Sequence, residues 1–282
     1  MKRRGACIGL AMVIAFTALP LAADGQKDNV DAIGNRKVAH KSIISEQKEI
    51  AVGKQYSEQV DRQSKLINDP VVTEYVNRVG QNIARNSDLK IPLTIKVIDD
   101  PSINAFALPG GFLYVNTGTI KAADEESQLA GVLAHEMAHV VKKHQLNDIR
   151  KNAQKGLALD LAQLRGGGGL AGEAARAFAR AGLDVYIRGL SREDELEADA
   201  VGVVIATRAG YEPYGLVSVL QTLQTVPQTN PDMALFLKTH PSPADRLTAL
   251  EAKLPAWFET LAKPNPALMR YNQTFRTVSA TK

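Results

Sequence analysis

The stretch Leu133-Ala134-His135-Glu136-Met137-Ala138-His139-Val140 decides the fold class of this chain, because it places the pattern H-E-x-x-H inside an apolar, helix-forming run. Positions i and i+4 of an α-helix lie about 40° apart around its axis, so His135 and His139 can bind one metal ion. Glu136 then lies beside that ion. Zinc lowers the pKa of a bound water to about 7, and a neighbouring carboxylate can accept the proton as the water attacks a carbonyl carbon. The pattern predicts a zinc hydrolase site that needs a third ligand.

A carboxylate-rich segment later in the chain offers that ligand. Ser191-Arg192-Glu193-Asp194-Glu195-Leu196-Glu197-Ala198-Asp199-Ala200 opens a helical pattern that runs to Gly210. Glu195 and Asp199 are four residues apart and share a face, whereas Glu197 points elsewhere. One of the two carboxylates can complete the metal site, and the other can accept a hydrogen bond from a ligand histidine and fix its orientation. The alternative is a surface helix with an acidic first turn, and the intact H-E-x-x-H favours the metal site over it.

Four segments of the chain resemble one family of zinc peptidases. The HtpX and CAAX-prenyl-protease metallopeptidases pair H-E-x-x-H with a later S-R-x-x-E-x-x-A-D, which this chain matches at Ser191-Arg192, Glu195 and Ala198-Asp199. Residues 104–118 and 239–246 are similar to the soluble periplasmic branch of that family, and the similarity runs from about residue 46 to residue 253. The resemblance implies an α+β, mostly α, zincin-like (gluzincin) metalloprotease domain with a small β-sheet and the H-E-x-x-H helix.

The resemblance also implies a role for each polar residue of the two motifs. Glu195 is expected to be the third zinc ligand beside His135 and His139. Glu136 is expected to be the catalytic base, and Asp199 is expected to hold a ligand histidine in place. One such ligand set implies one Zn²⁺ per chain.

Two further histidines, His144 and His240, could contribute to the site. His144 lies five residues past His139 and is turned away by about 140° on a helix, so we expect it not to be a ligand. His240 precedes Pro241-Ser242-Pro243, and on its own it would be interpreted as a loop residue. In the branch that the chain resembles, the corresponding segment lies over the metal. This implies either a plug in the open coordination position or a catalytic donor to the oxyanion, and we favour the plug. Arg246 is expected to tether this loop through a carboxylate.

A short sheet is predicted upstream of the metal helix. Residues 93–99 alternate like a strand, and a Leu108-Pro109-Gly110-Gly111 turn separates residues 104–107 from residues 112–116 as in a hairpin. An extended peptide can bind by pairing with a sheet edge, and in zincins that edge runs beside the metal helix. Because they precede the metal helix, the residues expected to supply the edge are Phe112, Leu113, Tyr114, Val115 and Asn116. The alternative is that the hairpin is only core, with Phe112 and Tyr114 packed inward.

Helical patterns account for most of the remaining chain. Residues 45–61 suggest one helix, and Asp69-Pro70 opens a second. Residues 146–165 and 170–187 have helical periodicity, and four glycines at 166–169 interrupt it. The glycine run is expected to be either a mobile lid or an ordinary surface loop.

The N-terminal composition predicts export. Lys2-Arg3-Arg4 precedes an apolar run to Leu21 and then Ala22-Ala23, which is the pattern of a secretory signal peptide. Pro20 interrupts the run, so a retained membrane anchor is the less favoured alternative. We therefore expect a signal peptide over 1–23, a linker over 24–44, the zinc metallopeptidase domain over 45–255 and a tail over 256–282. The expected location is the periplasm, and peripheral association with the membrane is left open.

Composition narrows the class of protein further. Cys7 is the only cysteine and would leave with the signal peptide, so the metal ligands must be histidine and carboxylate. Of the formal net charge of +4, three charges come from Lys2, Arg3 and Arg4, which leaves +1. No basic patch with interleaved aromatic residues remains to indicate nucleic acid binding. The 45% hydrophobic content is enough for one packed core.

These observations predict an exported zinc metalloendopeptidase. By resemblance, its partners would be protein substrates such as outer-membrane or misfolded envelope proteins. The main alternative is an envelope chaperone or assembly factor whose zinc site is normally plugged by His240. A purely structural zinc site is disfavoured, because such a site has no use for Glu136.

Overall fold

The computed structural model describes residue 39 and residues 44–163 and 189–253. Its helices are α1 (Glu46–Gln63), α2 (Pro70–Arg85), α3 (Thr117–Ala122), α4 (Glu126–Lys142), α5 (His144–Gln163), α7 (Arg192–Arg208), α8 (Gly215–Thr225), α9 (Pro231–Thr239) and α10 (Pro243–Lys253). Its strands are β1 (Thr94–Ile98), β2 (Ala105–Leu108) and β3 (Phe112–Asn116). The expected signal peptide, the glycine run, the helix over 170–187 and the tail lie outside the described residues. None of the helices in the described ranges combines the length and the hydrophobicity that a membrane span requires.

Both helices predicted before the sheet are confirmed. Ser45 caps α1 by accepting a hydrogen bond from the backbone N–H of Lys48, and Asp69 caps α2, which begins with Pro70. The apolar face of α2 packs in the main core through Val72, Tyr75, Val76, Val79 and Ile83. The helical spacing of these residues was sufficient to predict which face is buried.

A three-stranded sheet lies beside these helices, with the strands in the order β1-β3-β2. β1 runs parallel to β3, and β2 runs antiparallel to it, so the expected hairpin is confirmed. Gly110 and Gly111 have φ values of +79° and +84° in its turn. A Cβ on Gly110 would also lie 2.7 Å from the Cα of Ile50 on α1. The turn therefore requires glycine for its backbone conformation and for its packing.

The prediction that residues 112–116 supply a free sheet edge is wrong. β3 is the central strand and pairs with β1 on one side and β2 on the other, and α3 separates it from α4. The five side chains serve packing or local hydrogen bonding: Leu113 and Val115 lie in the main core, Phe112 and Tyr114 pack beside α1, and Asn116 donates to Ser102 Oγ. The alternative reading of this strand as core was the correct one, and the edge nearest α4 belongs to β2.

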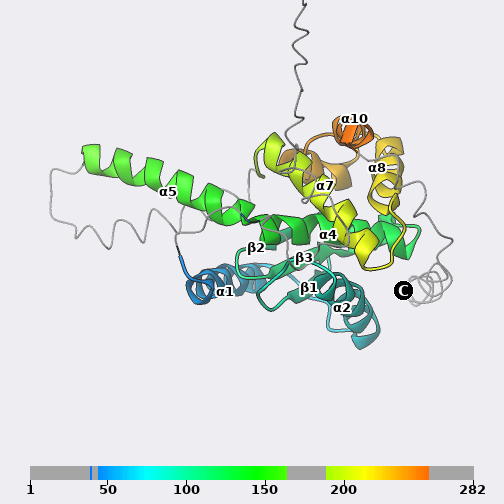
Figure 1. The fold of residues 1–282 in the computed structure, drawn as a ribbon, viewed down its shortest axis with the longest axis horizontal. Coiled ribbons are helices and arrows are strands. Elements are labelled where there is room, and N and C mark those ends of the chain that lie inside the picture. The colour runs from blue at the N-terminus through cyan, green and yellow to red at the C-terminus, as the bar shows by residue number, and fades with distance from the viewer. Residues whose placement is uncertain (1–38, 40–43, 164–188, 254–282) are drawn as a thin grey trace, which may run out of the picture.

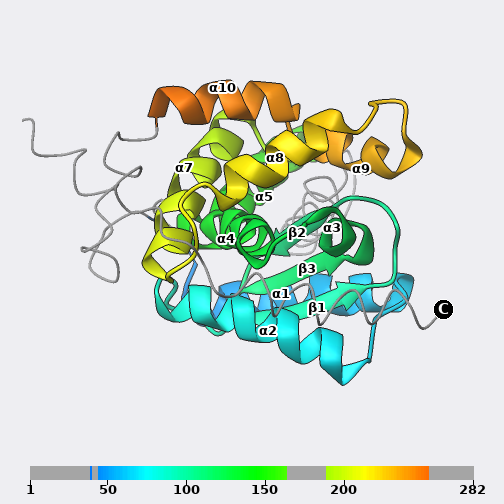
Figure 2. The same ribbon diagram turned by 90° about the vertical axis from the view of Figure 1, so that its right-hand side faces the viewer.

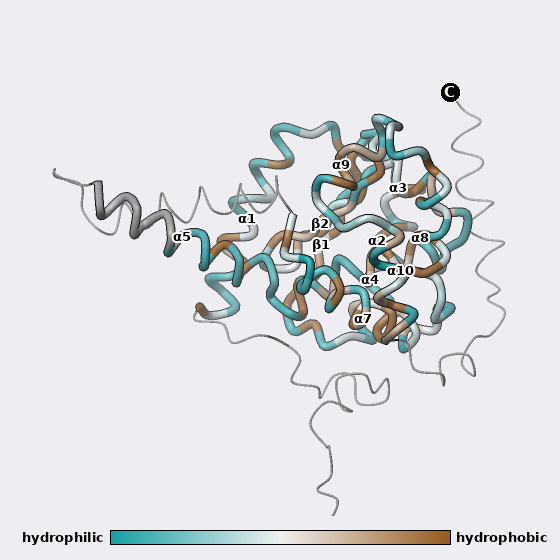
Figure 3. The backbone as a smooth tube through the Cα atoms, turned by 90° about the horizontal axis from the view of Figure 1, so that it is seen from above, coloured by the Kyte–Doolittle hydropathy of each residue, from teal (hydrophilic) through white to brown (hydrophobic). Residues whose placement is uncertain are grey.

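α4 is the centre of the molecule. In Figures 1 and 2 it runs between the sheet and the pair α7 and α8, and α1 and α2 lie on the other side of the sheet. It is buried along nearly its whole length, and Leu129, Leu133 and Met137 are fully buried. Figure 3 shows that most other helices alternate hydrophobic and hydrophilic stretches, as helices with one solvent-facing side do. The histidines of H-E-x-x-H therefore lie inside the protein.

Candidate metal centre

Three donor atoms from α4 and α7 converge in the interior. The Nε2 atoms of His135 and His139 lie 3.1 Å apart, and the two carboxylate oxygens of Glu195 each face one of them, Oε2 at 3.5 Å from His135 Nε2 and Oε1 at 3.4 Å from His139 Nε2. In a tetrahedral zinc site with bonds of about 2.0–2.1 Å, ligand atoms lie about 3.3 Å apart. The three side chains are buried, and their spacing fits one such ion.

Gly202 allows α7 to approach α4 closely enough for this cluster to form. A Cβ on Gly202 would lie 2.9 Å from the backbone nitrogen of His135 and 3.0 Å from its Cα. Any side chain at this position would therefore push α7, and Glu195 with it, away from the two histidines. The sequence carried one signal for this role, since a glycine in a helix interior costs about 1 kcal/mol relative to alanine and needs a packing reason.

Glu136 lies beside the cluster without joining it. Its Oε1 is 3.8 Å from His135 Nε2, and its side chain is buried. Burial raises the pKa of Glu136 above the usual range of a glutamate. A carboxylate with a raised pKa is a better proton acceptor. Its position suits a group that takes a proton from a water on the open side of the three ligands.

Asp199 and Arg246 fix the orientation of His135. Asp199 Oδ1 lies 2.7 Å from His135 Nδ1, and Arg246 binds the same carboxylate through Nε at 3.0 Å and Nη2 at 2.5 Å. The Nδ1 proton is directed at Asp199, which leaves the lone pair of Nε2 facing the cluster. Arg246 Nη2 also lies 3.2 Å from His135 Nδ1, but both atoms carry protons in this tautomer, so that contact is not a hydrogen bond.

The carboxylates around His135 favour a positive charge at this position. Burial and the charge of Arg246 lower the pKa of His135, but the carboxylates of Asp199 and Glu195 outweigh them and raise it to about 9. Burial also disfavours the charged form of Asp199, but Arg246 and His135 hold its pKa below the usual range. The two carboxylates therefore stay ionised and keep positive charge at the centre of the cluster, supplied by a proton or by a metal ion.

His240 approaches the cluster from the loop between α9 and α10. Its Nδ1 lies 2.7 Å from Glu195 Oε2, and its ring stacks on Phe236 with centroids 5.1 Å apart. Burial raises the pKa of Glu195, but His240 and His139 outweigh it and hold that pKa well below the usual range. The structure thus places His240 against Glu195, a position that is compatible with a plug and with a donor to the oxyanion.

Comparison with known proteins identifies the domain. A sequence model of peptidase family M48 matches residues 70–254, which include every residue of the cluster. The chain belongs to peptidase family M48. The fold class predicted from the sequence is confirmed, because the M48 domain is mostly helical with a small sheet beside the H-E-x-x-H helix.

Three relatives show how far the similarity extends. The M48 chain is 32% identical over 246 residues to a putative beta-barrel assembly-enhancing protease of Vibrio cholerae, covering 85% of this chain and 50% of that protein. It is 30% identical over 244 residues to the beta-barrel assembly-enhancing protease of Escherichia coli strain K12, covering 84% and 50%. It is 33% identical over 186 residues to the mitochondrial metalloendopeptidase OMA1 of Schizosaccharomyces pombe, covering 65% and 53%. The chain therefore spans about half the length of these relatives.

A groove along β2 leads to the metal cluster of the M48 domain. Its walls include Phe106, Ala107 and Leu108, and it reaches Glu136 and His240. The backbone N–H of Asn116 donates to the carbonyl of Asn104 at 3.0 Å, so residues 104, 106 and 108 direct their backbone groups at β3. Ala105 and Ala107 consequently direct theirs to the open edge of the sheet. The sheet edge beside α4, which was expected to be residues 112–116, is therefore β2.

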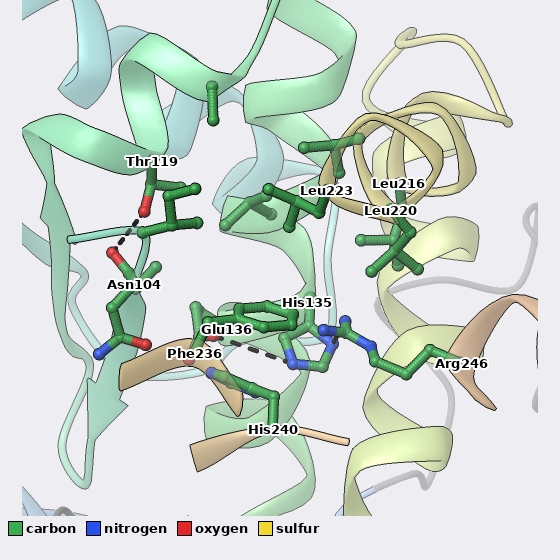
Figure 4. Close-up of a pocket in the computed structure, with 15 residues that line it drawn as sticks. Asn104, Thr119, His135, Glu136, Leu216, Leu220, Leu223, Phe236, His240 and Arg246 are labelled. Atoms are coloured by element: carbon green, nitrogen blue, oxygen red, sulfur yellow. Dashed lines mark hydrogen bonds and ion pairs between the residues drawn. The ribbon is translucent and has the colours of Figure 1, made fainter. Parts of the chain in front are cut away.

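A second pocket lies on the other side of Glu136. Its walls are mostly apolar, and Figure 4 shows three leucines of α8 along one side: Leu216, Leu220 and Leu223. Glu136 and His240 lie at one end in the same view. Because both pockets meet at Glu136, a chain that crosses the site can place one side chain in this apolar space.

The expectation that His144 is turned away from His139 is wrong. α4 ends at Lys142, Lys143 adopts a left-handed conformation with φ of +61°, and α5 begins at His144. This single residue redirects the chain, so that His144 Nδ1 lies 2.9 Å from His139 Nδ1. His144 is outside the three-residue ligand cluster of His135, His139 and Glu195, but it touches one of its members. Lysine rarely adopts positive φ, so this turn could not be predicted from the residue type.

Proposed function

We propose that this M48 protein is a zinc-dependent endopeptidase in which His135, His139 and Glu195 hold one Zn²⁺. The observation that carries the proposal is the convergence of three buried side chains, with donor atoms 3.1 to 3.5 Å apart, and of Glu136 Oε1 at 3.8 Å from His135 Nε2. Two imidazoles and a carboxylate are a ligand set that zinc takes in hydrolytic sites. When bound there, zinc would lower the pKa of a bound water to about 7. The ion would also polarise the carbonyl under attack.

Side chains of the protein transfer the proton and orient the ligand histidine His135. Glu136 accepts the proton of the attacking water and passes it to the leaving amine nitrogen. Burial raises its pKa, which makes this carboxylate a better proton acceptor than an exposed glutamate. Asp199 and Arg246 keep His135 in the tautomer whose Nε2 faces the ion.

We infer that substrates bind as an extended strand along β2. Ala107 lines the groove, and its backbone groups point away from β3 and can pair with a peptide backbone, which gives affinity with little demand on sequence. The apolar pocket beside Glu136 would then take an apolar side chain next to the scissile bond. In a series of otherwise identical peptides, cleavage beside leucine should exceed cleavage beside aspartate, and equal rates would remove the pocket from substrate recognition.

We propose that His240 is a plug that closes the resting site. Its contact of 2.7 Å with Glu195 and its burial against Phe236 support a closed site that opens when the α9–α10 loop moves. A closed site is also what the rival function, an envelope chaperone or assembly factor, would require. The complete ligand set and the placement of Glu136 support the peptidase over that rival.

The proposed substrates are proteins of the bacterial envelope, including outer-membrane and misfolded ones. Two relatives carry the name beta-barrel assembly-enhancing protease, which supports this choice. The basic and apolar N-terminal residues 1–23 support export to the periplasm. The metallopeptidase domain is proposed to span residues 45–255.

A casein-degradation assay with measured zinc content tests the proposed function. Glu136→Gln keeps the shape of the side chain but removes the base, so it should retain zinc and lose activity by several orders of magnitude. Glu195→Ala should instead lose zinc affinity by about 10-fold or more. Unchanged proteolysis in Glu136→Gln would mean that this site is not the catalyst. Full zinc occupancy in Glu195→Ala would remove Glu195 from the ligands.

A further inference from the structure

A second polar chain leads away from the other ligand histidine. His139 Nδ1 lies 2.9 Å from His144 Nδ1, and His144 Nε2 lies 3.1 Å from Glu197 Oε2. His144 is 1% exposed, whereas the side chain of Glu197 is 34% exposed. The chain therefore connects a buried ligand to a carboxylate near the surface of α7, the helix that also carries Glu195.

The proton positions in this chain follow from the proposed metal site. A metal bound at Nε2 of His139 leaves its only proton on Nδ1, which then donates to His144. His144 Nδ1 must accept, so the proton of a neutral His144 is on Nε2, which donates to Glu197. Each atom along the chain has one role, and no other arrangement of neutral rings leaves the Nε2 lone pair of His139 available to a metal.

We propose that His144 and Glu197 are positioning residues that fix the tautomer and orientation of His139, as Asp199 does for His135. This inference rests on the proposed function, because it concerns a ligand of the proposed zinc site. The two ligand histidines then have different partners, a carboxylate directly for His135 and a carboxylate through a second imidazole for His139. Such partners of ligand histidines typically contribute about 10- to 100-fold to metal affinity.

The fold holds His144 in place through the turn between α4 and α5. Lys143 is the only described residue other than glycine with positive φ. Its Nζ lies 2.7 Å from the carboxylate of Glu49, which is 1% exposed. Lys143 is also the left-handed C-cap of α4, and its backbone N–H donates to the carbonyls of His139 and Val140, so the turn that brings His144 against His139 is held by backbone hydrogen bonds and by this ion pair.

Zinc affinity of the full-length protein, measured by competition with a chelator at one pH, tests the inference. His144→Leu should weaken zinc binding by about 10- to 100-fold. His144→Asn should restore part of it, because the amide oxygen lies near the position of Nδ1 and can accept from His139, whereas the shorter side chain does not reach Glu197 as Nε2 does. Glu197→Gln should fall between the wild type and His144→Leu. Lys142→Met is the matched control, because it removes a second contact of Glu197, at 2.7 Å, and leaves the His144 contact.

A second readout separates positioning from packing. In cobalt-substituted protein, the visible absorption of the metal should change in His144→Leu and return towards the wild-type spectrum in His144→Asn. Wild-type zinc affinity and an unchanged spectrum in folded His144→Leu and Glu197→Gln would overturn the inference. If His144→Leu does not fold, Glu197→Gln decides: a zinc affinity equal to that of the wild type in this variant, as expected of the control Lys142→Met, would overturn the role of Glu197 and the inference with it. A wild-type protein that binds no zinc would overturn the proposed function itself.

Discussion

Asp199 Oδ1 lies 2.7 Å from His135 Nδ1 and accepts at the same time from Arg246, so one buried carboxylate connects a metal-facing histidine to α10. The metal site is therefore coupled to a helix that supplies none of its ligands. Arg246 also follows the loop that carries His240, which places the anchor of that loop inside the site.

Asp199→Asn should weaken zinc binding and destabilise the fold together. An amide cannot serve both the His135 N–H and the two N–H groups of Arg246, so Arg246 loses a buried partner. We expect a loss of about 10- to 100-fold in zinc affinity and of about 3–5 kcal/mol in the free energy of unfolding, measured by chelator competition and denaturant titration. Asp245→Asn makes the same change in an exposed pair and should cost about 1 kcal/mol or less. Native zinc affinity in Asp199→Asn would show that His135 needs no such partner.

His240→Ala distinguishes the two roles of that residue. If His240 is a plug, the substitution should raise basal casein degradation and self-cleavage. If it stabilises the oxyanion, turnover should fall by about 10- to 1,000-fold with zinc still bound. Combining it with Glu136→Gln should abolish any gain, which assigns the new activity to this site. Unaltered zinc binding and activity in His240→Ala would exclude both roles.

Ala107→Pro tests the edge of β2 as the substrate-binding strand. Proline removes a backbone N–H that faces the groove while leaving the pairing of β2 with β3 intact, a position that edge strands tolerate. Loss of one hydrogen bond predicts a fall of about 3-fold or more in kcat/KM for an extended peptide, with zinc content unchanged. Ala107→Ser keeps the N–H and should behave as wild type. Equal kcat/KM values for the two variants would argue against strand pairing here.

Gly202→Ala should separate α7 from α4. The added Cβ meets the backbone of His135, which cannot move without moving the ligand itself. We expect a loss of about 1–3 kcal/mol in stability and weaker zinc binding, since Glu195 shifts with α7. Gly210→Ala is the control: it strains a residue at φ +88° in open space, so stability should fall while zinc affinity stays. Strong zinc binding in Gly202→Ala would show that α7 has room to adjust.

Local spacing was enough to predict which side chains come together in the proposed metal site. His135 and His139 are one helical turn apart, as are Glu195 and Asp199, so each pair could be placed on one face without knowledge of the tertiary fold. The two helices α1 and α2, the strand β1 and the hairpin followed from similarly local patterns.

What the sequence could not predict depends on the arrangement of elements in space. The order of strands in a sheet differs from their order in the chain, so β3 became the central strand although it follows β2. Lys143 adopts a positive φ and pairs with Glu49, which is far away in sequence, and without this turn the direction of His144 cannot be deduced. The need for glycine at position 202 appears only when α7 lies on α4.

Because α4 and α7 supply buried metal ligands from separate parts of the chain, metal binding would stabilise the folded protein in the cell. An ion that binds the folded chain and not the unfolded chain adds stability that grows with its free concentration, by about 4 kcal/mol when that concentration is 1,000 times the dissociation constant. Folding and metal loading would then be one equilibrium. In a compartment poor in zinc, the same chain would lose its activity and also spend more time unfolded, exposed to other proteases.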